Sequence, residues 1–345
     1  MELIHPRDLA LWRERRDLRG QTGRLLRRLR GGAADEQVPV AELASIPGDD
    51  SGTRSTLVVL EDLDDRSMGA LLAPLPYLRG TVHCLVVGAQ SVPTELASLP
   101  RSPVQGLEDL LEATGAGAVL TAGGVGSWTR GLHEEAIGRG VTTFVLQTGQ
   151  VTPFSPPLPE NTTVVAWTDA DAALLRSGRH DVDTMAIGSQ RLWELSHDPV
   201  AELQDGPPVL LARLADDLLP RHLTTRAAAS ALRHGRLRLR PDVADTDPIS
   251  RASYELWRRR GAELVEPRAD LRAVPLVGVR QEELLEAAVR GVPVRVHAPG
   301  APAWLQDLWD RTGMRRSGGP GPSRPSPQPS EEPATVLAET LDGVR

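Results

Sequence analysis

Two polar residues that follow predicted buried strands in the first half of the chain are suited to acid–base and hydrogen-bonding chemistry. Asp62 follows the strand expected at residues 56–61, and Gln147 ends the strand expected at 142–147. A carboxylate at Asp62 could remove the proton of an attacking hydroxyl group, and the amide of Gln147 could hydrogen-bond a sugar hydroxyl. We therefore predict catalytic roles for both residues. Among the carboxylates that follow this strand, Asp65 would equally cap the next helix, and that structural alternative stays open.

A glycine-rich loop between a predicted strand and a predicted helix is the second candidate. Glycines let a backbone approach a ligand closely, and a helix N-terminus attracts anions. We predict that this loop holds an acceptor or a phosphate through Gly123, Gly124, Gly126 and Ser127. The loop has neither the dinucleotide-binding spacing nor a phosphate-binding lysine, so a tight turn capped by Ser127 is an equal alternative.

The second half of the chain offers cationic side chains for a nucleotide diphosphate. Arg240 ends a predicted strand and Arg280 precedes a predicted helix, and guanidinium groups can grip phosphate in a bidentate manner. Together with Gln281 they form the predicted donor-binding set, to which Glu286 is added because it could hold a ribose. Two observations argue against this prediction of a donor-binding site. The next helix begins with two glutamates that would repel phosphate, and Glu286 is placed to pair with Arg290 four residues on.

A sequence segment that occurs twice in the chain indicates the helices and strands that position these residues. Residues 135–145 (EAIGRGVTTFV) are echoed by 286–296 (EAAVRGVPVRV), and each copy predicts a helix that ends at a glycine before a short β-rich strand. Predicted strands alternate with predicted helices throughout. The expected fold class is α/β, with two Rossmann-like, doubly wound parallel-sheet domains facing a cleft. We expect domains at 56–200 (acceptor) and 201–316 (donor), preceded by a basic helix and polar connector over 1–55 and followed by a mobile Pro/Ser/Gly-rich tail with a short helix over 317–345.

Composition narrows the possible functions. All 39 basic residues are arginine, which excludes lysine Schiff-base chemistry and a Walker lysine, and the net charge of −7 argues against general nucleic-acid binding. Cys84 is the single cysteine, and the histidines lack the spacing of metal sites. We expect no metal, no organic cofactor and a cytoplasmic location. Residues 1–32 carry nine arginines, so contact with the inner face of a membrane or with a partner is possible, although a helix docked on the protein itself is favoured.

Several segments resemble the GT-B-fold glycosyltransferases, and the resemblance covers about residues 56–316. The most specific segments are 284–293 (LLEAAVRGVP), 302–305 (PAWL) with Trp309, and 145–149 (VLQTG). The chain looks like actinobacterial proteins related to capsule polysialyltransferases and teichoic-acid glycerophosphotransferases. It departs from those families at three motifs: Gln-Thr-Gly at 147–149 in place of Gln-His-Gly, Arg-Pro-Asp-Val at 240–243 in place of Arg-Pro-His-Pro, and Arg-Gln-Glu at 280–282 in place of Ser-Thr-Gly.

The resemblance implies a transferase that moves a sugar or polyol phosphate from a nucleotide-activated donor to a surface polymer or a glycosylated metabolite. The three departures favour a second hypothesis, a catalytically inactive GT-B-like protein that regulates or scaffolds an active transferase. A third hypothesis, a sugar-nucleotide 2-epimerase, is suggested by residues 281–283 (QEE) and ranks last because of their distance from Gly291.

Overall fold

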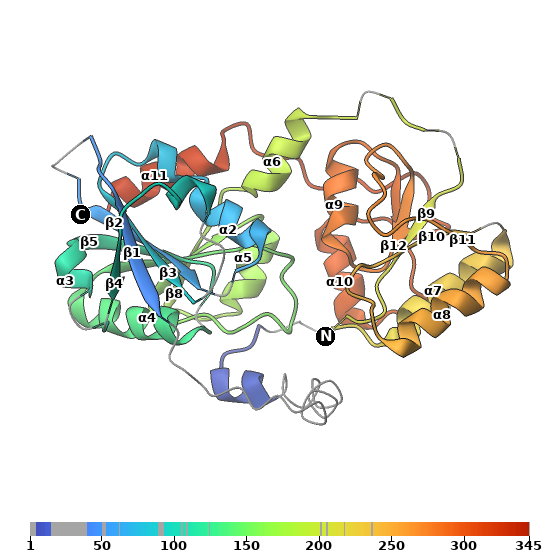
Figure 1. Ribbon diagram of the computed structural model, residues 1–345, viewed down its shortest axis with the longest axis horizontal. Helices are drawn as coiled ribbons and strands as arrows, with labels where there is room; N and C mark the ends of the chain where they lie inside the picture. Colours follow the sequence, from blue (N-terminus) through green and yellow to red (C-terminus); the bar gives the residue numbers. More distant parts are fainter. Residues whose placement is uncertain are drawn as a thin grey trace. The chain divides into compact units, whose positions relative to one another are not determined.

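The computed structural model (Figure 1) describes residues 5–14, 40–49, 53–61, 63–88, 93–104, 106–107, 110–123, 125–200, 202–204, 206–216, 218–235 and 237–344. Asp62, Gly124 and the greater part of the basic N-terminal stretch lie outside these ranges. The chain forms two compact units, one from residues 1–193 with 329–345 and the other from 194–328.

Unit 1 is built on one mixed sheet whose strands run in the order β4-β1-β3-β2-β5-β6-β7-β8. From β3 to β8 along this order every neighbouring pair is parallel, whereas β1 pairs antiparallel with β3 and β4 at one edge. The strands are β1 (Ala41–Ile46), β2 (Ser55–Glu61), β3 (Val82–Val87), β4 (Arg101–Val104), β5 (Ala116–Thr121), β6 (Thr142–Leu146), β7 (Thr162–Ala166) and β8 (Val182–Ala186).

Both faces of this sheet are covered, which explains why β2 and β5 are almost continuously apolar. Val58 and Leu60 point into one core cluster, shared with helices α2 and α11, while Leu57 and Val59 point into the other, shared with α3 and α4. The helical elements of this unit are α2 (Asp65–Leu72), η1 (Leu75–Tyr77), η2 (Thr94–Leu96), α3 (Leu110–Thr114), α4 (Ser127–Arg139), α5 (Asp169–Arg176), the start of α6 (Gln190–His197) and α11 (Pro333–Asp342).

Unit 2 has a five-stranded, all-parallel sheet in the order β11-β10-β9-β12-β13. Helices α7 and α8 lie on one face and α9 and α10 on the other (Figure 1). Trp257 and Tyr254 of α8 fill the core between the sheet and the first pair of helices. The elements are β9 (Val209–Ala212), α7 (Arg221–His234), β10 (Arg238–Pro241), α8 (Pro248–Arg259), β11 (Glu263–Leu264), β12 (Leu276–Gly278), α9 (Glu282–Val289), β13 (Val294–Val296) and α10 (Ala303–Arg311).

The two sheets confirm the predicted fold class of two Rossmann-like α/β domains. The two copies of the repeated segment also form the expected elements, α4 with β6 in the first copy and α9 with β13 in the second. Gly140 ends α4 in the left-handed conformation with φ of 67°, and Gly291 follows α9 with φ of 88°. Glu135 of α4 bonds Arg139, four residues on, at 2.6 Å, and Arg290 after α9 forms an ion pair with Asp198 at 2.9 Å.

Two segments differ from the sequence-based expectation. Residues 41–46, placed in a polar connector by their sequence, form strand β1, which pairs with β3 on one side and with edge strand β4 on the other, with Ala41 and Ala44 fully buried. The expected mobile tail divides between the units. Ser323 is buried and donates to the carbonyl of Val294 in β13, and α11 packs Leu337 and Leu341 into the core of unit 1. Pattern alone missed these contacts because proline-rich segments can be held by side-chain and backbone hydrogen bonds without regular structure.

Candidate functional site

Each sheet has a switch point, where the order of parallel strands reverses direction and where open α/β sheets commonly bind ligands. In unit 1 the chain moves outward from β2 to β3 and then crosses to β5, so the switch point lies beyond the carboxyl ends of β2 and β5. In unit 2 the corresponding position lies beyond β9 and β12. The predicted glycine loop follows β5, and Arg280 and Gln281 follow β12, so both sets stand at switch points.

At the switch point of unit 1, the carboxylate of Glu61 occupies the N-terminus of α4. Its Oε2 atom accepts from the backbone nitrogen of Thr129 at 2.8 Å and from the Thr129 hydroxyl at 2.7 Å, and its Oε1 atom accepts from the backbone nitrogen of Trp128 at 3.2 Å. The Ser127 hydroxyl adds a longer contact of 3.4 Å to Oε1. These N–H groups are the ones a phosphate would use at a helix N-terminus.

The glycine loop is shaped around this carboxylate. A Cβ atom on Gly126 would lie 2.0 Å from Oε2 of Glu61, so a side chain at position 126 would displace the carboxylate. Gly126 is also the N-cap of α4, and Ser127 is the first helical residue, not the cap. The sequence predicts that an external anion binds at this position. In the structure the carboxylate of Glu61 is bound there instead.

Gln147, the second predicted catalytic residue, joins β6 to the segment after β7. Its Oε1 atom accepts from the backbone nitrogen of Trp167 at 2.9 Å, and its Nε2 atom donates to the Gly149 carbonyl at 3.0 Å and to Asp171 at 3.2 Å. The side chain is 7% exposed. Both ends of the amide are thus engaged inside unit 1. The other predicted catalytic residue, Asp62, lies outside the described residues.

In unit 2, a buried carboxylate occupies the turn after β9. Both carboxylate oxygens of Asp245 accept from the backbone nitrogen of Leu214, at 2.9 and 3.1 Å, and Oδ1 accepts from that of Ala215 at 2.7 Å. The Tyr254 hydroxyl also donates to Asp245, and the pKa of Tyr254 is raised by burial and by this carboxylate. Asp245 is 6% exposed. It fills the backbone nest that a phosphate would enter at the first strand-to-helix turn of a Rossmann-like sheet.

The two predicted donor arginines are also paired with carboxylates. Arg280 lies 3.3 Å from Asp216, and the two side chains are 16% and 7% exposed. Arg240 forms a bidentate pair with Glu283, in which the arginine side chain is 16% exposed and the glutamate 36%. Asp216 also accepts from the backbone nitrogens of the following turn, at residues 218 and 219. The acidic first turn of α9 therefore neutralises Arg240 instead of merely facing it.

Gln281 supports the turn before α9. Its Oε1 atom accepts from the backbone nitrogens of Val279 and Arg280, both at 3.1 Å, and its Nε2 atom donates to the Leu211 carbonyl at 3.0 Å. The side chain thus ties the end of β12 to β9 across the switch point. Glu286 lies one turn further along α9, half-buried. The structure brings Arg240, Arg280 and Gln281 to the carboxyl edge of one sheet, as predicted from their place after the strands.

We call Glu61, Asp216, Asp245 and Glu283 the internal carboxylates. Together they satisfy backbone N–H groups at both switch points and pair with both candidate arginines. The sequence analysis did not select Glu61, Asp216 or Asp245 as site residues. A usable signal was nevertheless present, because Glu61 ends its strand and Asp216 follows its strand by four residues, at the edge where ligands are held. Within the described ranges, no three His, Cys, Asp or Glu side chains gather as metal ligands would.

Comparison with known proteins finds similarity only at the level of structure. No protein-family model and no curated protein sequence matches the chain. UDP-GlcNAc 2-epimerase from Methanocaldococcus jannaschii is 10% identical, with 84% of this chain and 99% of that chain covered and a TM-score of 0.48. MurG from Acinetobacter baumannii is 10% identical, with coverage of 84% and 90% and a TM-score of 0.42.

A third similar structure is the pneumococcal O-GlcNAc transferase GtfA in complex with UDP and GlcNAc, 14% identical over 70% of this chain and 54% of that chain, with a TM-score of 0.39. None of the helices in the described ranges is long and apolar enough to span a lipid bilayer.

Proposed function

We propose that this chain is a glycosyltransferase-like protein that regulates or scaffolds an active transferase and does not itself transfer a sugar. The observation that carries the proposal is the set of internal carboxylates. In a donor-binding sheet, backbone N–H groups and arginine side chains at the carboxyl edge are left for the diphosphate. In this chain those groups already bind Asp216, Asp245 and Glu283.

Electrostatics favours the regulatory or scaffolding role over direct catalysis. A donor diphosphate would have to displace the carboxylate partner of Arg280, yet Asp216 is 7% exposed and would remain close to the new anion. Separating a buried ion pair so that one charge is left uncompensated costs about 3–5 kcal/mol. Asp245, buried in the neighbouring turn, would add a further repulsion. The free energy of donor binding would therefore be made less favourable by these two carboxylates.

Transfer from a nucleotide-activated sugar or polyol donor is the second candidate. It is favoured by the half-exposed Glu283, which a diphosphate could replace on Arg240 more readily than it could replace Asp216 on Arg280. In that case Arg240 would hold the leaving phosphate, and a surface polymer or glycosylated metabolite would be the acceptor. The alternative of a 2-epimerase has less support, because Gln281 and Glu283 are engaged with the chain itself.

Calorimetric titration with UDP, CDP, CMP and GDP sugars and CDP-glycerol separates the two candidates. We expect no binding to the wild-type protein and measurable binding to the double variant Asp216→Asn with Glu283→Gln, which frees both arginines. A control variant, Glu255→Gln, removes an exposed carboxylate that pairs with Arg258 and Arg259 and should not gain affinity. Tight donor binding or turnover by the wild-type protein would overturn the regulatory proposal in favour of catalysis.

A further inference from the structure

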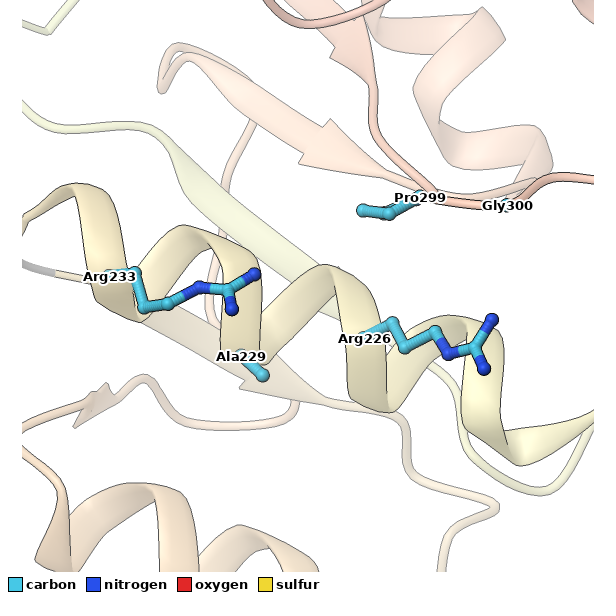
Figure 2. Close-up of a pocket in the computed structure, with 5 residues that line it drawn as sticks. All are labelled: Arg226, Ala229, Arg233, Pro299 and Gly300. Atoms are coloured by element: carbon cyan, nitrogen blue, oxygen red, sulfur yellow. The ribbon is translucent and has the colours of Figure 1, made fainter.

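A cavity of about 440 Å³ on unit 2 is lined by two arginines that pair with no carboxylate of the described residues. Arg226 and Arg233 of α7 border it together with Ala229, and Pro299 and Gly300 from the loop after β13 face them (Figure 2). Both arginines are exposed, and neither forms an ion pair or a side-chain hydrogen bond among the described residues. They contrast with Arg240 and Arg280, whose charges are neutralised within the chain.

The helix α7 fixes the spacing of Arg226 and Arg233 along its axis. Residues seven apart lie on the same face of an α-helix, separated by about 10 Å along its axis. Ala229 lies between them on that face, and its small side chain leaves room above the helix axis. The loop opposite comes close because residue 300 is glycine. Its φ is 77°, and Nη1 of Arg226 lies 3.3 Å from the point that a Cβ atom would occupy.

We propose that this cavity is a docking surface for an acidic α-helix of a partner protein. Two carboxylates seven residues apart on such a helix have the same axial spacing, about 10 Å, as Arg226 and Arg233 on α7. A small residue between them would pack on Ala229 and Pro299, since helices approach to about 8–10 Å where side chains are small. In a chain of net charge −7, two cationic side chains that form no ion pair with the described residues also direct an acidic partner to this face.

The proposal adds a partner surface to the regulatory role proposed above. Its test uses no nucleotide, so its failure would leave the closed donor site unaffected. The full-length protein is titrated, by fluorescence anisotropy at low ionic strength, with two alanine-rich helical peptides of identical composition. One has two glutamates seven residues apart, on the same face; the other has them five apart, on different faces. We expect at least tenfold tighter binding of the first peptide.

The double variant Arg226→Glu with Arg233→Glu should lose this binding and should instead bind a peptide with arginines seven apart. The matched control, Arg260→Glu with Arg268→Glu, changes the net charge equally at two exposed arginines of the same unit and should bind like the wild type. Equal binding of the two acidic peptides, or unchanged binding by the first double variant, would overturn the proposal. Saturable binding of phosphatidylglycerol vesicles or of tripolyphosphate, without discrimination between the peptides, would assign the cavity to another anion.

Discussion

The carboxylate of Glu61 and the backbone of Gly126 are so close that a single added carbon atom would separate them. The position for a Cβ atom on Gly126 lies 2.0 Å from Oε2 of Glu61. This relationship explains why the residue before α4 is glycine without any external ligand. The glutamate satisfies backbone donors of the first helical turn that would otherwise need water or an anion.

The first prediction concerns that pair. Gly126→Ala should lower the free energy of unfolding by about 1–3 kcal/mol, because it expels a carboxylate from partly buried hydrogen bonds. Gly138→Ala, in the same helix with no atom near its Cβ position, is the matched control and should raise stability by up to about 1 kcal/mol. Urea denaturation followed by circular dichroism measures both. Equal effects of the two substitutions would contradict the assigned role of Glu61.

The second prediction concerns the buried carboxylate of unit 2. Tyr254 donates from its hydroxyl to Asp245, which in turn accepts from the turn after β9. Tyr254→Phe should cost about 1–2 kcal/mol of stability by leaving part of Asp245 unsatisfied, and Asp245→Ala should cost more, because buried backbone donors then lose their acceptor. Thermal unfolding of both variants tests the order. A larger loss from Tyr254→Phe than from Asp245→Ala would argue against the nest-filling role of Asp245.

The sequence predicted the architecture better than it predicted the site. Alternating apolar segments and the glycines after α4 and α9 were sufficient to predict the parallel strands of both sheets, because these signals are local. The antiparallel strands β1 and β4 of unit 1 were not predicted. The internal carboxylates depend on contacts between segments 30 or more residues apart, such as Leu214 with Asp245, and on which acidic side chain turns inward. Residue type places Arg240 and Arg280 at the sheet edge, but only the fold reveals that Glu283 and Asp216 neutralise them.

A third prediction follows from two buried histidines of unit 1. Burial lowers the pKa of His5 to about 4 and that of His133 to about 4, from an ordinary value of 6.5. The unfolded chain therefore takes up protons between pH 6.5 and 4 that the folded chain does not. Stability should be fully present above about pH 6.5 and should fall as the pH decreases to 4, by up to about 3 kcal/mol for each histidine.

Urea denaturation at a series of pH values measures this slope. His133→Gln removes one of the two contributions and should flatten the profile between pH 6.5 and 4, even if the variant is less stable at pH 7. His133 bonds the Thr121 hydroxyl through Nε2 at 3.2 Å, a contact that glutamine can replace in part. An unchanged slope in the variant would mean that another group controls the acid sensitivity.

The last prediction concerns α11, which returns from the end of the chain to unit 1. Leu337 is 2% exposed in the core shared with β2 and β3, and Glu332 before the helix accepts hydrogen bonds from Tyr77 and Gln190. Leu337→Ala should destabilise the protein by about 2–5 kcal/mol through loss of burial and formation of a cavity. The matched control is Glu339→Ala on the exposed face, which should change stability by less than about 0.5 kcal/mol. Hydrogen exchange adds a local measurement, because protection should decrease in α11 and in the neighbouring β2 after Leu337→Ala. Loss confined to α11, with β2 unchanged, would show that the helix rests on unit 1 without contributing to the stability of its sheet.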